Sequence, residues 1–396
     1  MKRTVSNSIV AQLRAPRGLS RSGKVLAILF SLAIETKAAP TQTIARWKLS
    51  EIPIVTIGSQ GNPQTEFQVV RGVARTSTGE IVVANGGSSE LRVFDASGNH
   101  LKTFGRVGAG PGEFEALSWI GRSGDSVYLY DYALMRVSVF SVRDGIHGSA
   151  LAAKAPRRQF LPLLRLSSGR YLVKQLKTPS MRRADGTFRD STMLGIVQPS
   201  LQVPVHWFGP FPAMTHLALN PANEESARSV GIYRLGPRTF WAVVGDSIWI
   251  GDSSGDELIL VDERGRTVRS IVLGWHAQEF DREALQRQAA RELTLLRSSR
   301  DSTAVAARYE RKYLARFQPV FENLLSTVDG NLWVERFRTE PATAAIALVV
   351  SPTGRRIAEL RVPPRFRVSE VGDDYVAGVH TAEDGAQSVR LYRLLK

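Results

Sequence analysis

One strand pattern recurs six times along this chain of 396 residues, and the recurrence limits the folds that the chain can adopt. Each copy has a turn with glycine, then a short strand rich in β-branched and aromatic residues, then a polar turn into a second apolar strand. The copies are TGEIVVAN (78–85), SGDSVYLYD (123–131), SGRYLVKQ (168–175), VGDSIWIGD (244–252), DGNLWVER (329–336) and VGDDYVAG (371–378). Their marker glycines lie 45, 45, 76, 85 and 42 residues apart. The short intervals match one four-stranded unit of about 40 to 50 residues, so the two long intervals carry insertions.

Repeated four-stranded units predict an all-β ring of sheets. A lone antiparallel sheet leaves both faces uncovered, whereas sheets stacked around an axis cover each other's faces. We therefore predict a six-bladed β-propeller over residues 46–396. The sixth copy ends at Lys396 after its third strand, and EIPIVTIG (51–58) looks like the missing outer strand. We expect this N-terminal strand to close the last blade, with an independent N-terminal strand as the alternative.

Three segments carry a family resemblance: FGRVGAGPGEF (104–114), VVANGGSSELRVFD (82–95) and WIGDSSGDELILVD (249–262). They resemble NHL-type repeats of exported bacterial six-bladed propellers of the TolB-like type. The resemblance extends from about residue 46 to the end of the chain. The third copy departs from it, because Gln175 stands where aspartate is usual. Members of this group include binding scaffolds, lactonases and lyases, so the resemblance implies the fold and leaves the activity open.

Residues 279–318 interrupt the β pattern between blades four and five. Apolar residues fall three or four positions apart at Leu285, Ala289, Leu293 and Leu296, and a second such series runs from Ala306 to Phe317. We predict a helical insertion that packs on one rim of the propeller. The alternative is a lid or a helix that docks a partner.

The first 38 residues have the pattern of an export signal. A long basic region precedes an apolar run from Val25 to Ile34, and the small residue Ala38 follows a short polar stretch. This run is too short to span a bilayer, which requires roughly 20 residues. We expect a periplasmic or secreted protein with residues 1–38 removed, and an uncleaved membrane anchor is the alternative.

The chain is strongly basic, with a formal net charge of +15 that falls to +9 without residues 1–38. Such a balance raises the question of nucleic acid or another anionic partner. The strongest bias in the mature chain lies in residues 154–189, which hold ten basic residues and one acidic residue, Asp185. We expect a solvated basic rim there, with an anionic ligand or polysaccharide as the alternative. An export signal argues against nucleic acid, which we do not expect as a partner.

Polar residues end the aligned strands and would form a ring in a propeller. They are Asn85, Asp131, Gln175, Asp252 and Glu335, with His380 just past the sixth strand. If this ring faced the central channel, its oxygen atoms could hold a hard cation such as Ca²⁺, which could polarise a lactone carbonyl. Alternatively, these side chains brace turns through hydrogen bonds to the backbone.

The function that we expect is an exported binding or interaction scaffold, which uses the channel mouth for a small ligand, a glycan or a protein partner. The alternative, implied by gluconolactonase-like propellers, is a metal-dependent lactonase or related hydrolase. In that enzyme Asp131, Asp252 and Glu335 would be ligands and Asn85 would orient substrate. We expect a monomer that needs no cofactor, with Ca²⁺ or another divalent cation as the alternative. The sequence holds no GxSxG, HExxH or Walker motif and no cysteine.

Overall fold

A computed structural model describes residues 44–58, 61–124, 126–142, 160–176, 185–201, 206–219, 229–294 and 305–396. The predicted export signal, residues 1–38, lies outside this part of the chain. The compact unit that contains every described residue spans residues 43–396. Within the described residues, no helix is long and apolar enough to cross a membrane.

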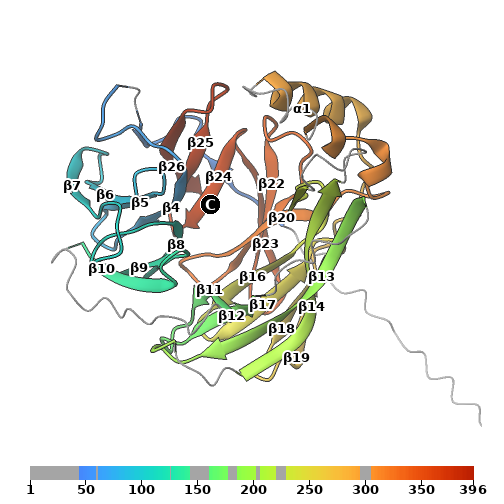
Figure 1. Cartoon of the computed structure of the whole chain (residues 1–396), viewed down its shortest axis with the longest axis horizontal. Helices are drawn as coiled ribbons and strands as arrows, with labels where there is room; N and C mark the ends of the chain where they lie inside the picture. Colours follow the sequence, from blue (N-terminus) through green and yellow to red (C-terminus); the bar gives the residue numbers. More distant parts are fainter. Residues whose placement is uncertain are drawn as a thin grey trace, which may run out of the picture. The chain divides into compact units, whose positions relative to one another are not determined.

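The described residues form six sheets, which are antiparallel apart from one short added strand (Figure 1). We number the sheets in chain order. The first holds β4 (Val70–Arg75), β5 (Ile81–Asn85), β6 (Glu90–Phe94) and β7 (His100–Phe104). The second holds β8 (Leu117–Ser123), β9 (Ser126–Asp131) and β10 (Arg136–Ser141). The third holds β11 (Phe160–Arg165), β12 (Tyr171–Gln175), β13 (Gly186–Val197), β14 (His206–Leu219) and β15 (Ser229–Ile232).

The remaining three sheets follow the same up-and-down order. The fourth holds β16 (Thr239–Val244), β17 (Ser247–Asp252), β18 (Glu257–Val261) and β19 (Thr267–Val272). The fifth holds β20 (Phe321–Ser326), β21 (Leu332–Arg336), β22 (Ala345–Val350) and β23 (Arg356–Val362). The sixth holds β24 (Phe366–Val371), β25 (Tyr375–Thr381) and β26 (Gln387–Leu395). Each of the six repeat copies supplies the second strand of one sheet.

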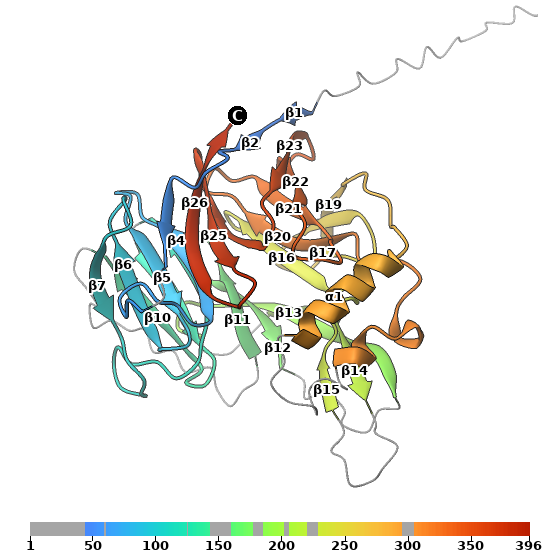
Figure 2. The ribbon, with the colours of Figure 1, turned by 90° about the horizontal axis from the view of Figure 1, so that it is seen from above.

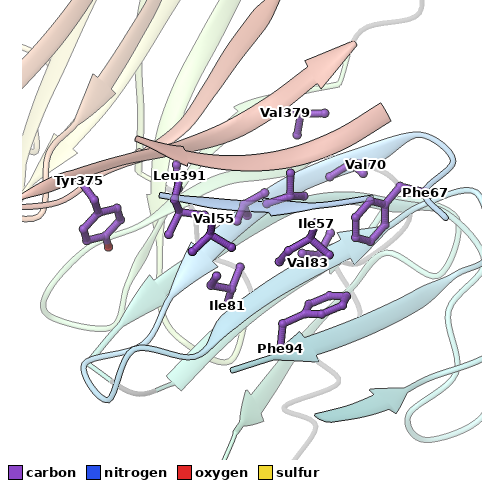
Figure 3. Close-up of a cluster of buried hydrophobic side chains, with 13 residues drawn as sticks. Val55, Ile57, Phe67, Val70, Ile81, Val83, Phe94, Tyr375, Val379 and Leu391 are labelled. Atoms are coloured by element: carbon purple, nitrogen blue, oxygen red, sulfur yellow. The ribbon is translucent and has the colours of Figure 1, made fainter. Parts of the chain in front are cut away.

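Hydrophobic side chains pack between consecutive sheets, and this packing closes a ring. Trp249 of the fourth sheet lies fully buried against the fifth, and Trp333 of the fifth lies fully buried against the sixth. The last cluster joins the sixth sheet to the first, where Ile57 and Leu391 meet Ile81 and Phe94 (Figure 3). Every sheet therefore has its faces covered by two neighbours, which is the arrangement of a β-propeller.

The N-terminal segment closes the ring, as its sequence predicted. Strand β3 (Val55–Ile57) pairs with β26, and Ile57 lies opposite Val389. Before it, β2 (Lys48–Leu49) pairs with the far end of β26, and β1 (Ala45–Arg46) adds in parallel to β23 of the fifth sheet (Figure 2). Both ends of the described unit thus meet in one sheet, and the N-terminal strands also tie that sheet to its neighbour.

One helix, α1 (Arg282–Thr294), follows β19 in the chain and precedes β20. The Asp281 carboxylate accepts backbone hydrogen bonds from Glu283 and Ala284, so it caps the helix. Leu285 is buried against Tyr233 and Phe337, whereas Ala289 and Leu293 are partly buried. The second predicted series begins with a helical turn at residues 305–308 and continues as the 3₁₀ turn η2 (Arg311–Tyr313), whereas Phe317 is 43% exposed. Leu296 lies outside the described residues.

Candidate functional site

A cavity of about 470 Å³ lies at the centre of the ring. The inner strands of five sheets line it: β4, β8, β16, β20 and β24. Its apolar wall includes Trp119 and Phe240, and its polar wall holds four arginines and two glutamates. The charged residues are Arg71, Arg238, Arg338, Arg367, Glu322 and Glu335.

β-Bulges in the inner strands supply part of this lining. The pairing of β4 with β5 skips Arg71, that of β20 with β21 skips Glu322, and that of β24 with β25 skips Ser369. A bulge inserts one unpaired residue and re-aims its side chain. All three of these extra residues line the central cavity. The bulges therefore direct these polar side chains into the cavity, whereas the regular alternation of a strand would point them to the opposite face.

The carboxylate of Glu322 is already paired. Its Oε1 lies 2.7 Å from Nε of Arg338, and its Oε2 lies 3.8 Å from Nη1 of Arg234. Arg71, Arg238 and Arg367, in contrast, form no ion pair with any residue that the structure describes. The cavity wall therefore carries three guanidinium groups without a close ion pair among the described residues, although Glu322 and Glu335 favour the charged forms of Arg238 and Arg367 from a longer distance.

Arg71 and Arg367 are exposed at the cavity wall, whereas Arg238 is half-buried. Desolvation lowers the pKa of Arg367, and the nearby charge of Arg71 lowers it further. Desolvation also lowers the pKa of Arg238, with a second contribution from Arg234. Arg367 keeps a hydrogen bond of 2.8 Å to the Val70 carbonyl. An arginine remains cationic through such shifts, so repulsion between these groups favours a bound anion.

Glu335 is the one strand-end candidate that lines the central cavity. Its Oε1 accepts hydrogen bonds from Asn323 Nδ2 at 2.8 Å and from Trp333 Nε1 at 3.1 Å. Burial raises its pKa to about 7, against the opposing effect of these hydrogen bonds. The residue Glu335 is only 2% exposed. Its carboxyl group can therefore gain or lose a proton near neutral pH inside the cavity.

Asn85 and Asp131 bind the loops that lead into the inner strands. Asn85 Oδ1 accepts the backbone N–H of Gln68 at 2.9 Å, and its Nδ2 donates to Ser88. Asp131 Oδ2 accepts the backbone N–H groups of Glu115 and Ala116 at 2.7 and 3.0 Å. Both side chains are buried, and their oxygen atoms brace turns.

Asp252, Gln175 and His380 have three different surroundings. Asp252 forms a bidentate ion pair with Arg189, in which Nη2 and Nη1 of the arginine lie 3.0 and 3.1 Å from the two carboxylate oxygens. This pair joins the fourth sheet to the third. Gln175 lines a separate cavity of about 160 Å³. Burial lowers the pKa of His380, as do the charges of Arg390 and Arg365. Among the described residues, no three His, Cys, Asp or Glu side chains are grouped so that they could hold a metal ion.

The basic segment 154–189 is described only in part, because residues 154–159 and 177–184 lie outside the structure. Its described basic side chains have separate contacts. Arg165 lies over the Tyr128 ring at 4.2 Å, Arg170 pairs with Glu263, and Arg189 pairs with Asp252. The basic side chains of this segment that the structure describes thus contact different neighbours.

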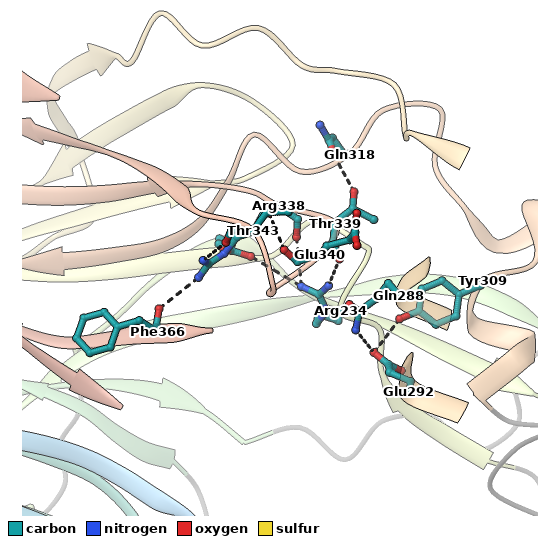
Figure 4. A network of polar contacts seen from close by, with 11 residues as sticks. Arg234, Gln288, Glu292, Tyr309, Gln318, Arg338, Thr339, Glu340, Thr343 and Phe366 are labelled. Atoms are coloured by element: carbon teal, nitrogen blue, oxygen red, sulfur yellow. Dashed lines mark hydrogen bonds and ion pairs between the residues drawn. The ribbon is translucent and has the colours of Figure 1, made fainter. Parts of the chain in front are cut away.

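A polar network connects the helical segment with the cavity wall (Figure 4). Arg234 donates hydrogen bonds to the carbonyls of Arg338 and Thr339. On the helix side, Arg287 pairs with Glu340 at 2.9 Å, and Tyr309 donates to Glu292 at 2.7 Å. The loop that carries Arg338 is thus held by Arg234 from the turn between β15 and β16 and by Arg287 from α1.

The sequence pointed to the strand ends and missed the arginines of the inner strands. Arg71, Arg238 and Arg367 stand outside the aligned copies, because those copies contain only the second strand of each sheet. Alternation of apolar and polar residues in FRVS (366–369) is a signal that could have revealed Arg367, whereas RGVAR (71–75) does not alternate in this way.

Comparisons with known proteins identify the fold. No family model matches the sequence, and no curated protein matches it. A member of the DUF4221 family from Bacteroides vulgatus is 9% identical, with a TM-score of 0.50 over 89% of this chain and 99% of that one. An exported protein of Bacteroides fragilis is 14% identical, with a TM-score of 0.46 over 89% of this chain and all of that one. Regucalcin, a calcium-binding protein from Agrobacterium tumefaciens, is 11% identical, with a TM-score of 0.42 over 89% and 97% of the two chains. At these identities the similarity shows the fold alone, and the chain is a β-propeller.

Proposed function

We propose that this protein binds a small anionic molecule, bearing carboxylate or phosphate-like groups, in the central cavity. The observation that carries the proposal is the set of three arginines, Arg71, Arg238 and Arg367, that face one cavity without a carboxylate partner among the described residues. Cations that share one cavity wall repel each other, and a bound anion relieves this repulsion. A planar guanidinium group offers paired N–H donors that match carboxylate and phosphate oxygens.

The rest of the wall suits a small organic anion. Ser369 has a buried hydroxyl with no hydrogen-bond partner among the described residues, and it lines the same cavity. Trp119 and Phe240 provide apolar surface for a carbon skeleton. A cavity of about 470 Å³ lies within the range of about 300 to 1,000 Å³ that is usual for small-molecule sites. These features support a binding scaffold for a small ligand.

The metal-dependent lactonase remains the second candidate, and the contacts of its proposed ligands support it less. Asp131 and Asp252 already accept hydrogen bonds from backbone and arginine donors, and Glu335 lies apart from both in the central cavity. Thermal unfolding in chelator and in millimolar Ca²⁺ separates the candidates. A higher midpoint in Ca²⁺ that disappears in Asp252→Ala would favour the metal site, and an unchanged midpoint would favour the anion site.

Titration calorimetry at low ionic strength tests the anion proposal directly. We expect sulfate and citrate to bind and glucose, a neutral molecule, to give no heat. Replacing Arg367 or Arg71 with glutamine removes a charge-assisted contact of roughly 1.5 to 3 kcal/mol, so affinity should fall about tenfold or more. Arg282→Gln removes the same charge from an exposed helix position and is the matched control. Equal weakening in all three variants would contradict a built site.

We also propose that the six sheets are the six blades of one NHL-type ring and that the chain is exported as a monomer after loss of residues 1–38. The basic and apolar pattern of that segment supports export. N-terminal sequencing of the protein recovered from the periplasm or medium tests this point. A mature N-terminus near residue 39 is expected, and an intact Met1 would contradict cleavage.

A further inference from the structure

A second, smaller cavity lies between the third and fourth sheets, on the other side of β16 from the central cavity. Arg238 and Phe240 line the central cavity, whereas Thr239 and Trp241 line the smaller one. Successive side chains of a strand point to opposite faces, so β16 separates the two spaces. The smaller cavity has a volume of about 160 Å³, and the two share no lining residue.

Lys174 lines this cavity, next to the hydrophobic cluster between the third and fourth sheets. On β12 it shares a strand face with Leu172, which is fully buried against Ile248 and Ile250 of the fourth sheet. Its ammonium nitrogen lies 5.9 Å from the centre of the Trp241 ring. No carboxylate of the described residues lies within 4 Å of that nitrogen, and residues 177–184, which continue the chain, contain no acidic residue.

The cavity wall combines apolar and polar groups around this amine. Leu176, Met214 and Trp241 give apolar surface, while Thr192 and Thr239 bring hydroxyl groups. The charged or titratable groups that face Lys174 across the cavity are Asp190 on β13 and His216 on β14, since β16 contributes only Thr239 and Trp241. Desolvation lowers the pKa of Lys174, which increases the fraction of neutral amine near pH 7.

We propose that Lys174 is the reactive amine of a second ligand site, which takes a small aldehyde or 2-oxo acid as an imine on its Nζ. The amine lone pair attacks the carbonyl carbon and forms the C–N bond. The amine then loses both of its hydrogens, and the carbonyl oxygen leaves with them as water. A volume equal to about five water molecules limits the ligand to a few non-hydrogen atoms. This site is separate from the central cavity, so either proposal can fail without the other.

Reductive trapping tests the site in the full chain. Glyoxylate with cyanoborohydride converts the imine to a stable carboxymethyl amine, and peptide mapping locates it. At pH 7 we expect Lys174 to react faster than the exposed Lys102, because burial lowers the pKa of Lys174 and leaves more of its amine neutral. Its rate should also saturate with glyoxylate concentration, whereas the rate at Lys102 should rise linearly. A Lys174 rate equal to or below that of Lys102, or one that rises linearly, would overturn the proposal.

Two variants control for the folded structure. Lys174→Arg keeps the positive charge but cannot form the imine, so it should lose the saturable reaction and leave Lys102 labelling unchanged. Lys174→Met keeps an unbranched side chain without the charge and should behave in the same way. Saturable labelling that persists in either variant would place the site at another lysine and contradict the assignment.

Discussion

In the fifth sheet, the position equivalent to Asn85, Asp131 and Asp252 is held by Arg336, and Glu335 lies one residue before it. Asn85, Asp131 and Asp252 each face the first residue of their inner strand, whereas Arg336 occupies that position in the fifth sheet. Because side chains alternate along a strand, a shift of one residue moves the side chain to the opposite face. This offset explains why Glu335 lines the central cavity while the other strand-end carboxylates brace turns or pair with arginine.

The buried carboxyl group of Glu335 should make stability depend on pH. Its pKa rises from 4.5 to about 7 on folding, so the folded state binds the proton more tightly. Stability should therefore be highest below pH 4.5 for this group and fall as the pH rises to 7, with a total loss of about 3 kcal/mol. Glu335→Gln removes this loss. In urea unfolding we expect the variant to exceed the wild type at pH 8 and to match it at pH 4.5.

The control for this prediction is Glu51→Gln, which removes a carboxylate from an exposed position. It should leave the pH profile of the wild type unchanged. If Glu335→Gln is no more stable than the wild type at pH 8, then Glu335 does not carry an elevated pKa.

The same carboxyl group should regulate the proposed anion site. Above pH 7 the Glu335 carboxylate adds a negative charge to the cavity, and below pH 7 that charge disappears. We therefore expect sulfate, which does not titrate in this range, to bind more tightly at pH 6 than at pH 8. Calorimetry at the two pH values measures the change, and Glu335→Gln should flatten it. Tighter binding at pH 8 would argue against an anion in this cavity.

The ion pair of Asp252 with Arg189 should stabilise the contact between the third and fourth sheets. Both side chains are less than one third exposed, and the pair has two hydrogen bonds. In a double-mutant cycle with Asp252→Asn and Arg189→Gln, we expect a coupling energy of about 1 to 2 kcal/mol in urea unfolding. The exposed pair of Arg266 with Asp262 is the comparison and should couple by less than about 1 kcal/mol. Equal coupling in the two pairs would show that the bridge adds nothing to the contact between sheets.

At the scale of elements, much of the β-structure was predictable from the sequence because each sheet repeats the same local signals. Turn glycines such as Gly79 and Gly330 have positive φ angles and precede second strands that begin within three residues. The long hairpin of β13 and β14 was not predictable. Its two register shifts, between Arg189 and Ser191 and between Thr192 and Leu194, follow the third copy, and only contacts with neighbouring strands fix such shifts.

The central site was less predictable than the strands. Local periodicity shows that Arg367 alternates with apolar residues, but it does not show that Arg367 and Arg71 face one cavity. That juxtaposition depends on ring closure, which brings β4 beside β24 across nearly the whole chain length. The bulges at Arg71 and Ser369 add a further shift that no local pattern encodes.

Strand β3 should contribute strongly to stability because it carries the closing contact. Ile57 is 2% exposed and packs in the cluster that joins the sixth sheet to the first (Figure 3). Ile57→Ala should cost roughly 2 to 5 kcal/mol in urea unfolding, as is usual for a buried large-to-small substitution. Thr56→Ala changes the adjacent exposed residue and should alter stability by less than about 0.5 kcal/mol. Similar effects of the two substitutions would show that this strand does not hold the ring closed.

At the scale of the whole molecule, the closed ring predicts a single cooperative unfolding transition. In an open array of repeats, a terminal unit can unfold while the rest persists. Here the loss of any sheet exposes the hydrophobic clusters on both sides of it, and the ring has no free terminal sheet. Weakening the first and sixth sheets should therefore destabilise the fourth and fifth equally.

The tryptophans allow this coupling to be measured. Trp249 and Trp333 are buried in the fourth and fifth sheets, whereas Ile57 lies between the sixth sheet and the first. In Ile57→Ala we expect the urea midpoint from tryptophan fluorescence and the midpoint from far-ultraviolet circular dichroism to fall together and to coincide. If the fluorescence midpoint stays at the wild-type value while the dichroism midpoint falls, then the sheets unfold separately, and the N-terminal strand stabilises only its own sheet.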